Sequence, residues 1–65
     1  MNRRFEVTFL TTAGNEFVGT FVMPDRNAVI GFIKSQELLI IDLGERGEAV
    51  IAPENIDALV IRVVG

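Results

Sequence analysis

The sequence predicts a mainly β domain, a small and strongly bent five-stranded barrel of the Sm-like or SH3-like kind. Three observations favour it: short runs of alternating apolar and polar residues, turn-forming residues between these runs, and the lack of a long helical pattern. With 65 residues, the chain has room for a single domain, residues 1–65. An α+β arrangement, ββαββ with a helix near residues 25–36, is the alternative.

The first two strands are predicted to form a hairpin. Phe5 to Phe9 alternates strictly, and Glu16 to Met23 resumes the alternation after a break. The intervening Ala13-Gly14-Asn15 favours a turn, because Gly and Asn adopt positive φ at low cost. Gly19 lies inside the second run, where a residue without a side chain suits a sharp bend or a close backbone approach.

The next segment, Ala28 to Gln36, follows a turn at Met23 to Asn27 and is ambiguous. We predict a strand, because Val, Ile and Phe favour strands and Gly31 costs about 1 kcal/mol in a helix interior. At 100° per residue the same apolar residues also gather on one face, as in a short helix begun by Asp25.

Three more strands are predicted in the second half: Glu37 to Leu43, Glu48 to Ala52 and Ala58 to Val64, with a glycine-flanked break at Gly44 to Gly47. The runs near residues 38–43 and 58–64 are apolar on both faces. We predict that they are edge strands, which pair with a neighbouring copy and close a ring. The candidate interface residues are Leu38, Leu39, Ile40, Ile41, Leu59, Val60 and Ile61.

Composition also predicts self-assembly. A domain this small buries only about 60% of the surface of its unfolded chain, and such domains are usually stabilised by disulfides, metals or oligomerisation. The chain contains neither Cys nor His, and 49% of its residues are hydrophobic. We therefore expect a homo-oligomer, with no metal site and no cofactor.

The same inventory argues against catalysis. Without His there is no evident base to activate Ser35 or a threonine, and no carboxylate pair lies in an evidently buried context. We therefore predict a protein that is not an enzyme and has no catalytic residues. A net charge of −3 disfavours non-specific binding to a phosphate backbone. No apolar stretch approaches the ~20 residues that span a bilayer, so we expect a cytoplasmic protein without a membrane partner.

Two segments resemble the motifs of the Sm/LSm family of small β-barrels, which includes Hfq-like proteins. Gly14 to Phe21, followed by Asp25 and Asn27, is similar to the first motif, with a turn glycine, a Gly-Thr pair and an aspartate before an asparagine. Gly47 to Ile56 is similar to the second motif. Ala52-Pro53 stands where the family has Arg-Gly, so the second motif has diverged.

The resemblance implies a homo-oligomeric ring and single-stranded RNA as the ligand class, with bases held by stacking and edge contacts. Carried over by position, the RNA-binding candidates are Asp25, Arg26, Asn27 and Asn55. The lost Arg-Gly pair and the lack of Tyr, Trp and His favour a second hypothesis. This is an oligomeric protein-interaction or scaffolding module with no nucleic-acid role.

Overall fold

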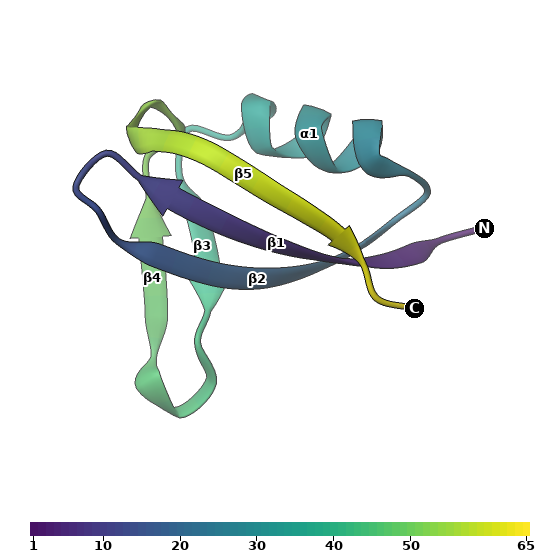
Figure 1. Ribbon diagram of the computed structural model, residues 1–65, viewed down its shortest axis with the longest axis horizontal. Helices are drawn as coiled ribbons and strands as arrows, with labels where there is room; N and C mark the ends of the chain where they lie inside the picture. Colours follow the sequence, from purple (N-terminus) through teal and green to yellow (C-terminus); the bar gives the residue numbers. More distant parts are fainter.

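The computed structural model describes residues 1–65 and combines five strands with one α-helix and two single 3-10 turns (Figure 1). The elements follow one another as β1 (Arg3–Thr11), β2 (Glu16–Met23), α1 (Arg26–Ser35), β3 (Leu39–Asp42), η1 (Gly44–Arg46), β4 (Glu48–Ile51), η2 (Pro53–Asn55) and β5 (Ile56–Val63).

Strand β1 is the centre of a three-stranded antiparallel sheet in the order β2-β1-β5. Val7 lies opposite Gly19 of β2 on one side and opposite Ile61 of β5 on the other. The predicted β1–β2 hairpin is confirmed, and Gly14 occupies its turn with a φ of 86°. The alternation along β1 places Phe5, Val7 and Phe9 on the core side, where all three are buried.

Strands β3 and β4 form a separate two-stranded antiparallel ribbon. Its core side carries Leu39, Ile41 and Ile51, which are all buried. The break predicted between these strands is the 3-10 turn η1, and Gly47 after it has a φ of 94°, a conformation that side chains disfavour. The ribbon is therefore a short hairpin with one apolar face turned toward the sheet.

The mainly β class is confirmed, but the strands do not close into a barrel. The ribbon runs across the three-stranded sheet instead of continuing it, and its turn projects beyond β2 (Figure 1). The crossing is tight at Gly19, where an added Cβ would lie 3.3 Å from Ile41 Cγ2. Of the two roles expected at Gly19, a sharp bend or a close backbone approach, the structure shows a close approach, made by the side chain of Ile41 to the Gly19 backbone. Because β3 crosses β2 face to face, the ladder that would close a barrel between them is absent.

The strand predicted over Ala28 to Gln36 is wrong, because this segment forms helix α1 and matches the alternative. Asp25 is the N-cap residue, and its Oδ1 accepts a hydrogen bond from the Ala28 N–H at 2.8 Å. Val29 and Ile33, four residues apart, are the buried helix residues. Burial of this stripe together with the cap outweighs the strand propensity of the individual residues.

The core lies between the sheet, the helix and the ribbon. Its buried side chains come from all three parts, and Phe21 of β2 joins sheet and helix through ring contacts with Phe9 and Phe32, at centroid distances of 6.1 and 6.0 Å. The complete set of buried core residues is Phe5, Val7, Phe9, Val29, Ile33, Leu39, Ile41 and Ile51. No polar side chain is buried, so apolar packing alone joins the three parts.

We expect Gly19→Val to lower the free energy of unfolding by about 1–3 kcal/mol, because the new side chain would collide with Ile41 at the crossing. Gly31→Ala is the matched control. Its Cβ would meet no atom within 4 Å, and alanine should stabilise the helix by up to about 1 kcal/mol. Urea unfolding followed by circular dichroism, at one fixed protein concentration, measures both. Equal stability of the Gly19→Val variant and the wild type would contradict a tight crossing.

Candidate assembly surface

The predicted RNA-binding residues of the first motif lie at the start of helix α1. Asp25 caps the helix through its carboxylate, and Arg26 and Asn27 are the first two helical residues. All three side chains are exposed. The cap hydrogen bond gives Asp25 a structural role that is independent of any ligand.

Asn55, the fourth predicted RNA-binding residue, lies at the opposite end of the sheet. Its carbonyl accepts a hydrogen bond from the N–H of Thr12, just past the end of β1, whereas Asp25 lies in a hollow with Arg3 at the start of β1. The nine residues of β1 separate the two positions by roughly 25 Å at about 3.3 Å per residue. Within one chain the structure therefore does not bring the four residues together into one pocket.

The predicted interface residues divide into buried and exposed positions. In β3, Leu39 and Ile41 belong to the core of this chain, so they are not available to a neighbour. Leu59 and Ile61 of β5 are half-buried and pack against the core from the sheet edge. Leu38, Ile40 and Val60 remain exposed. The alternation of buried and exposed residues in a strand explains this division.

The outer face of the ribbon carries an apolar pair that is open to solvent. Ile40 and Val50 lie directly opposite each other and are 64% and 61% exposed. Leu38, 56% exposed, lies just before β3 and lines one hollow together with Ile40. The sequence prediction missed Val50. Because neighbouring residues of a strand point to opposite faces, the adjacent Val50 and Ile51 indicated that this strand is apolar on both faces. Contiguous exposed apolar side chains of this kind are typical of interaction surfaces.

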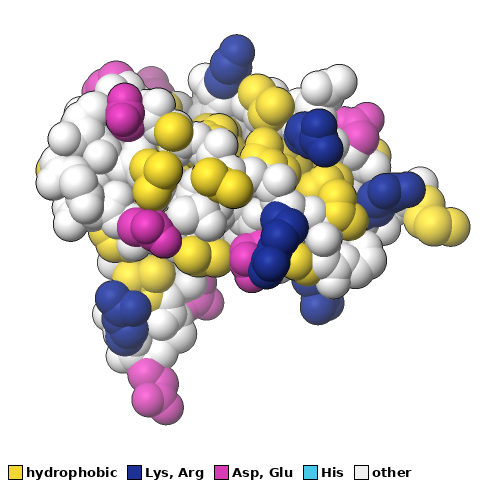
Figure 2. Space-filling model, viewed as in Figure 1, with side chains coloured by type: hydrophobic (Ala, Val, Ile, Leu, Met, Phe, Trp, Pro, Cys, Tyr) yellow, Lys and Arg dark blue, Asp and Glu magenta, His cyan; other side chains and the backbone are white.

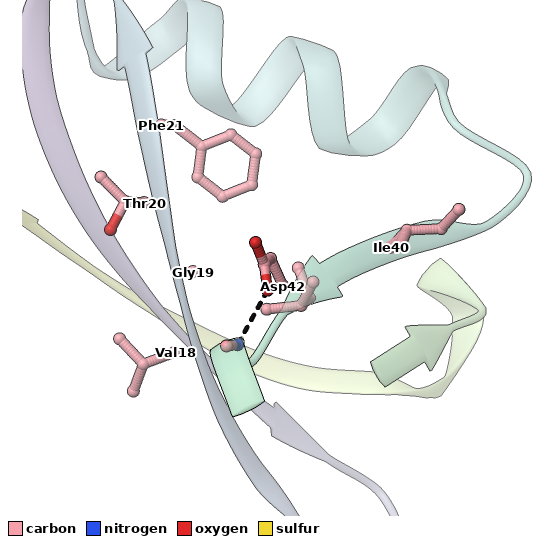
Figure 3. A pocket seen from close by; sticks show the side chains of 8 residues that line it. Val18, Gly19, Thr20, Phe21, Ile40 and Asp42 are labelled. Carbon is pink, nitrogen blue, oxygen red and sulfur yellow. Dashed lines mark hydrogen bonds between the residues drawn. The ribbon is translucent and has the colours of Figure 1, made fainter. Parts of the chain in front are cut away.

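The edge of β3 that faces away from β4 is not free, because it lies over β2. A shallow groove of about 440 Å³ separates the two strands (Figure 3). Val18 and Thr20 line the β2 side, Ile40 and Asp42 the β3 side, and Asp42 Oδ1 accepts a hydrogen bond from the Gly44 N–H at 2.8 Å. A strand added along this edge would have to separate β3 from β2 at the tight crossing.

The outer edge of β4 pairs with no strand of this chain, and its Val50–Ile51 end borders a hollow beside the β1–β2 turn. Leu43 donates a backbone hydrogen bond to the Gly47 carbonyl at 2.8 Å, which makes these two a hydrogen-bonded pair. Because hydrogen-bonded and non-hydrogen-bonded pairs alternate along an antiparallel ladder, Ala49 directs its backbone groups toward β3. Glu48 and Val50 therefore direct their N–H and C=O groups outward, where no other strand of the chain lies.

The outer edge of β5 is open as well. The N–H of Val64 donates to the Arg4 carbonyl at 3.0 Å, which makes these two residues a hydrogen-bonded pair of the β1–β5 ladder. The same alternation leaves Leu59, Ile61 and Val63 with their N–H and C=O groups pointing away from the sheet. In the order β2-β1-β5 no strand lies beyond β5.

The outer face of the three-stranded sheet is mixed in character, as Figure 2 shows with yellow side chains among charged ones. Val18 and Val60 flank Thr8 in one row across the three strands. In the next row Arg62 donates to Glu6 Oε1 at 2.8 Å, and both side chains are exposed. An exposed pair of this kind contributes little to stability, about 0–1 kcal/mol.

Comparison with known proteins finds no matching family model, no significantly similar curated protein and no significantly similar solved structure. No helix is long and apolar enough to cross a membrane. No group of three or more carboxylates is placed to hold a metal ion. The surface features that remain are the outer edges of β4 and β5, the outer edge of β2 beside the groove, and the apolar pair on the ribbon.

The capping role of Asp25 can be measured directly. We expect Asp25→Ala to lower the free energy of unfolding by about 1 kcal/mol, because the Ala28 N–H loses its acceptor. Asp25→Ser should retain most of the stability, and Asn27→Ala should be close to neutral. Urea unfolding compares the three variants. If Asp25→Ala were as stable as Asn27→Ala, the cap would be unimportant.

Proposed function

We propose that this protein is a non-enzymatic assembly module whose copies join edge to edge into a homo-oligomer. The open edge of β4 in one copy pairs in antiparallel fashion with the open edge of β5 in the next. The product is a platform for protein interaction, with a closed ring as its symmetric form. The observation that carries the proposal is that the two edges match. On each edge every second residue directs its N–H and C=O groups outward, and these residues include Val50 on β4 and Leu59 and Ile61 on β5.

The residues that direct their backbone N–H and C=O groups outward decide which faces of β4 and β5 meet in the pair. In an antiparallel pair, the outward-directed residues of one strand lie opposite the outward-directed residues of the other, and their side chains share a face. Val50 would therefore lie beside Leu59 or Ile61 of the neighbour. These residues are half-buried at the border of the neighbour's core. The pairing would extend that core over the exposed side chains of Val50 and Ile40.

The contact is head-to-tail, because it joins two different edges of the chain. A β4 edge meets a β5 edge, so every copy keeps one unused edge of each kind until the assembly closes. Such head-to-tail contacts produce a ring when the rotation between copies closes. A ring is also what the resemblance to the Sm/LSm family implies. It would leave no open strand edge at either β4 or β5.

We do not extend the proposal to RNA. The four residues expected to bind RNA are divided between the two ends of β1 within one chain, and Asp25 is engaged in capping α1. The chain lacks Tyr, Trp and His for base stacking, and its net charge is −3. These features favour the protein-interaction hypothesis over the nucleic-acid one.

Val50→Lys tests the proposed edge contact. A lysine at this position would place a charge in the apolar part of the interface, and we expect a large fall in the assembled mass at micromolar concentration. Val22→Lys is the matched control, because Val22 is 58% exposed on the outer face of β2, away from the β4 and β5 edges that the proposal pairs. Analytical ultracentrifugation measures the masses, and circular dichroism verifies that both variants fold.

The control should keep the wild-type mass. A wild-type protein that sediments as a monomer at 100 µM would contradict the proposal outright. So would an unchanged mass of the Val50→Lys variant.

A further inference from the structure

We infer that an arginine-lined hollow at the end of β5 receives the acidic end of the ribbon from a second copy of this chain. This contact would fix the register of the strand pairing, with Val50 opposite Ile61 of the neighbour and Glu48 opposite Val63. The inference rests on the proposed function, since it specifies how two copies meet. It adds a charged docking site that strand edges alone do not require.

The acidic end of the ribbon, Asp42 and Glu48, has no cationic partner within its own chain. Asp42 and Glu48 lie directly opposite each other in a non-hydrogen-bonded pair, the arrangement that brings side chains closest. Like charges in this position repel. Arg62 with Glu6 is the only salt bridge of the molecule, so even Arg46 in the adjacent turn pairs with neither carboxylate. The ribbon end projects beyond β2, where a neighbour has access to it (Figure 1).

The hollow lies at the other end of the molecule, where β1 begins and β5 ends. Phe5, Pro24 and Val63 supply its apolar walls, and its charged residues are Arg3, Asp25 and Arg26. Asp25 offsets part of the positive charge, and its Oδ1 accepts the cap hydrogen bond of α1, so two arginines face one carboxylate in the hollow. Neither arginine forms a salt bridge.

The arrangement of charge over the whole molecule agrees with a head-to-tail contact. In the view of Figure 2, Lys and Arg side chains concentrate on the right, around the two termini. Most Asp and Glu side chains lie on the left and at the ribbon end below, where one Lys or Arg side chain lies as well. Two copies related head to tail therefore bring opposite charges together, whereas two copies meeting at like ends would repel.

Charge complementarity decides between the two registers that the hydrogen-bond phase permits. With Val50 opposite Leu59, Glu48 would lie opposite Ile61, on an apolar row that continues to the buried Val7. With Val50 opposite Ile61, Glu48 would lie opposite Val63. Val63 lines the arginine hollow, so in this register the Glu48 carboxylate faces guanidinium groups instead of the apolar row.

Engineered cysteines test the register, and the cysteine-free chain makes the result easy to interpret. Directly opposite strand residues have a Cα separation of about 5.5 Å, which a disulfide spans. After mild oxidation, the double variant Glu48→Cys with Val63→Cys should give a ladder of covalent oligomers on a non-reducing gel. The matched variant Glu48→Cys with Ile61→Cys should not. A ladder from the second variant alone would overturn the inferred register.

Charge exchange tests the docking site. We expect Glu48→Arg and Arg26→Glu each to remove the assembled species at concentrations where the wild type keeps it. An equimolar mixture of the two variants should restore it, because the glutamate introduced in one variant can then face the arginine introduced in the other. Glu37→Arg and Lys34→Glu are the controls, since both residues are exposed and lie outside the contact. Ultracentrifugation at 50 and 500 mM NaCl gives the masses, and urea unfolding verifies the fold of each variant.

The outcomes separate the two levels of the proposal. If Val50→Lys breaks the assembly while Glu48→Arg and Arg26→Glu leave its mass unchanged at both salt concentrations, the docking site is overturned and edge pairing stands. Failure of the mixture to recover the assembly also overturns the docking site. A monomeric wild type overturns both. Loss in the single variants, recovery in the mixture and wild-type mass in the controls support the docking site.

Discussion

The crossing of β3 over β2 at Gly19 is the constraint on which the rest of the structure depends. With no side chain at this position, Ile41 can approach the backbone of β2, and the ribbon lies across the sheet instead of beside it. The crossing brings the ribbon side chains Leu39 and Ile41 onto the core side. It also occupies one edge of the ribbon, so the outer edge of β4 is the one that stays open.

The small size of the hydrophobic core is a second feature that favours association of this chain. Eight buried side chains, with no disulfide and no buried polar network, form a small core for a chain of 65 residues. Meanwhile Ile40 and Val50 remain in solvent on the ribbon. Covering them with the half-buried residues of β5 from another copy would add apolar burial that a single chain cannot supply. The open edges and the small core thus favour the same solution, association.

Much of the fold could be predicted from the sequence, and the failures have identifiable causes. Strict alternation predicted the β1–β2 hairpin, and the missing side chain at Gly19 predicted a close approach. Helix α1 was predicted as a strand because propensity was weighed residue by residue. The cap at Asp25 and the joint burial of Val29 and Ile33 decide the matter, and the burial depends on packing that sequence patterns do not contain.

The candidate surface was less predictable than the fold. Continuous apolar runs identified β5 as an edge, but could not say that Leu39 and Ile41 would be core residues or that β4 would provide the ribbon's open edge. These properties depend on the crossing of β3 over β2. Asp25 and Asn55 lie apart because one is near the start of β1 and the other near its end. The motif comparison gives positions in the sequence and does not show this separation in space.

A symmetric pairing of β5 with the β5 strand of a second copy would also satisfy the hydrogen-bond phase, because Leu59, Ile61 and Val63 can face one another across a two-fold axis. Such a dimer would leave Val50 in solvent. It would leave Glu48 without a cation as well. The head-to-tail pairing uses the open edges of β4 and β5 and both unpaired charge groups, so it accounts for features of the surface that the two-fold dimer leaves unexplained.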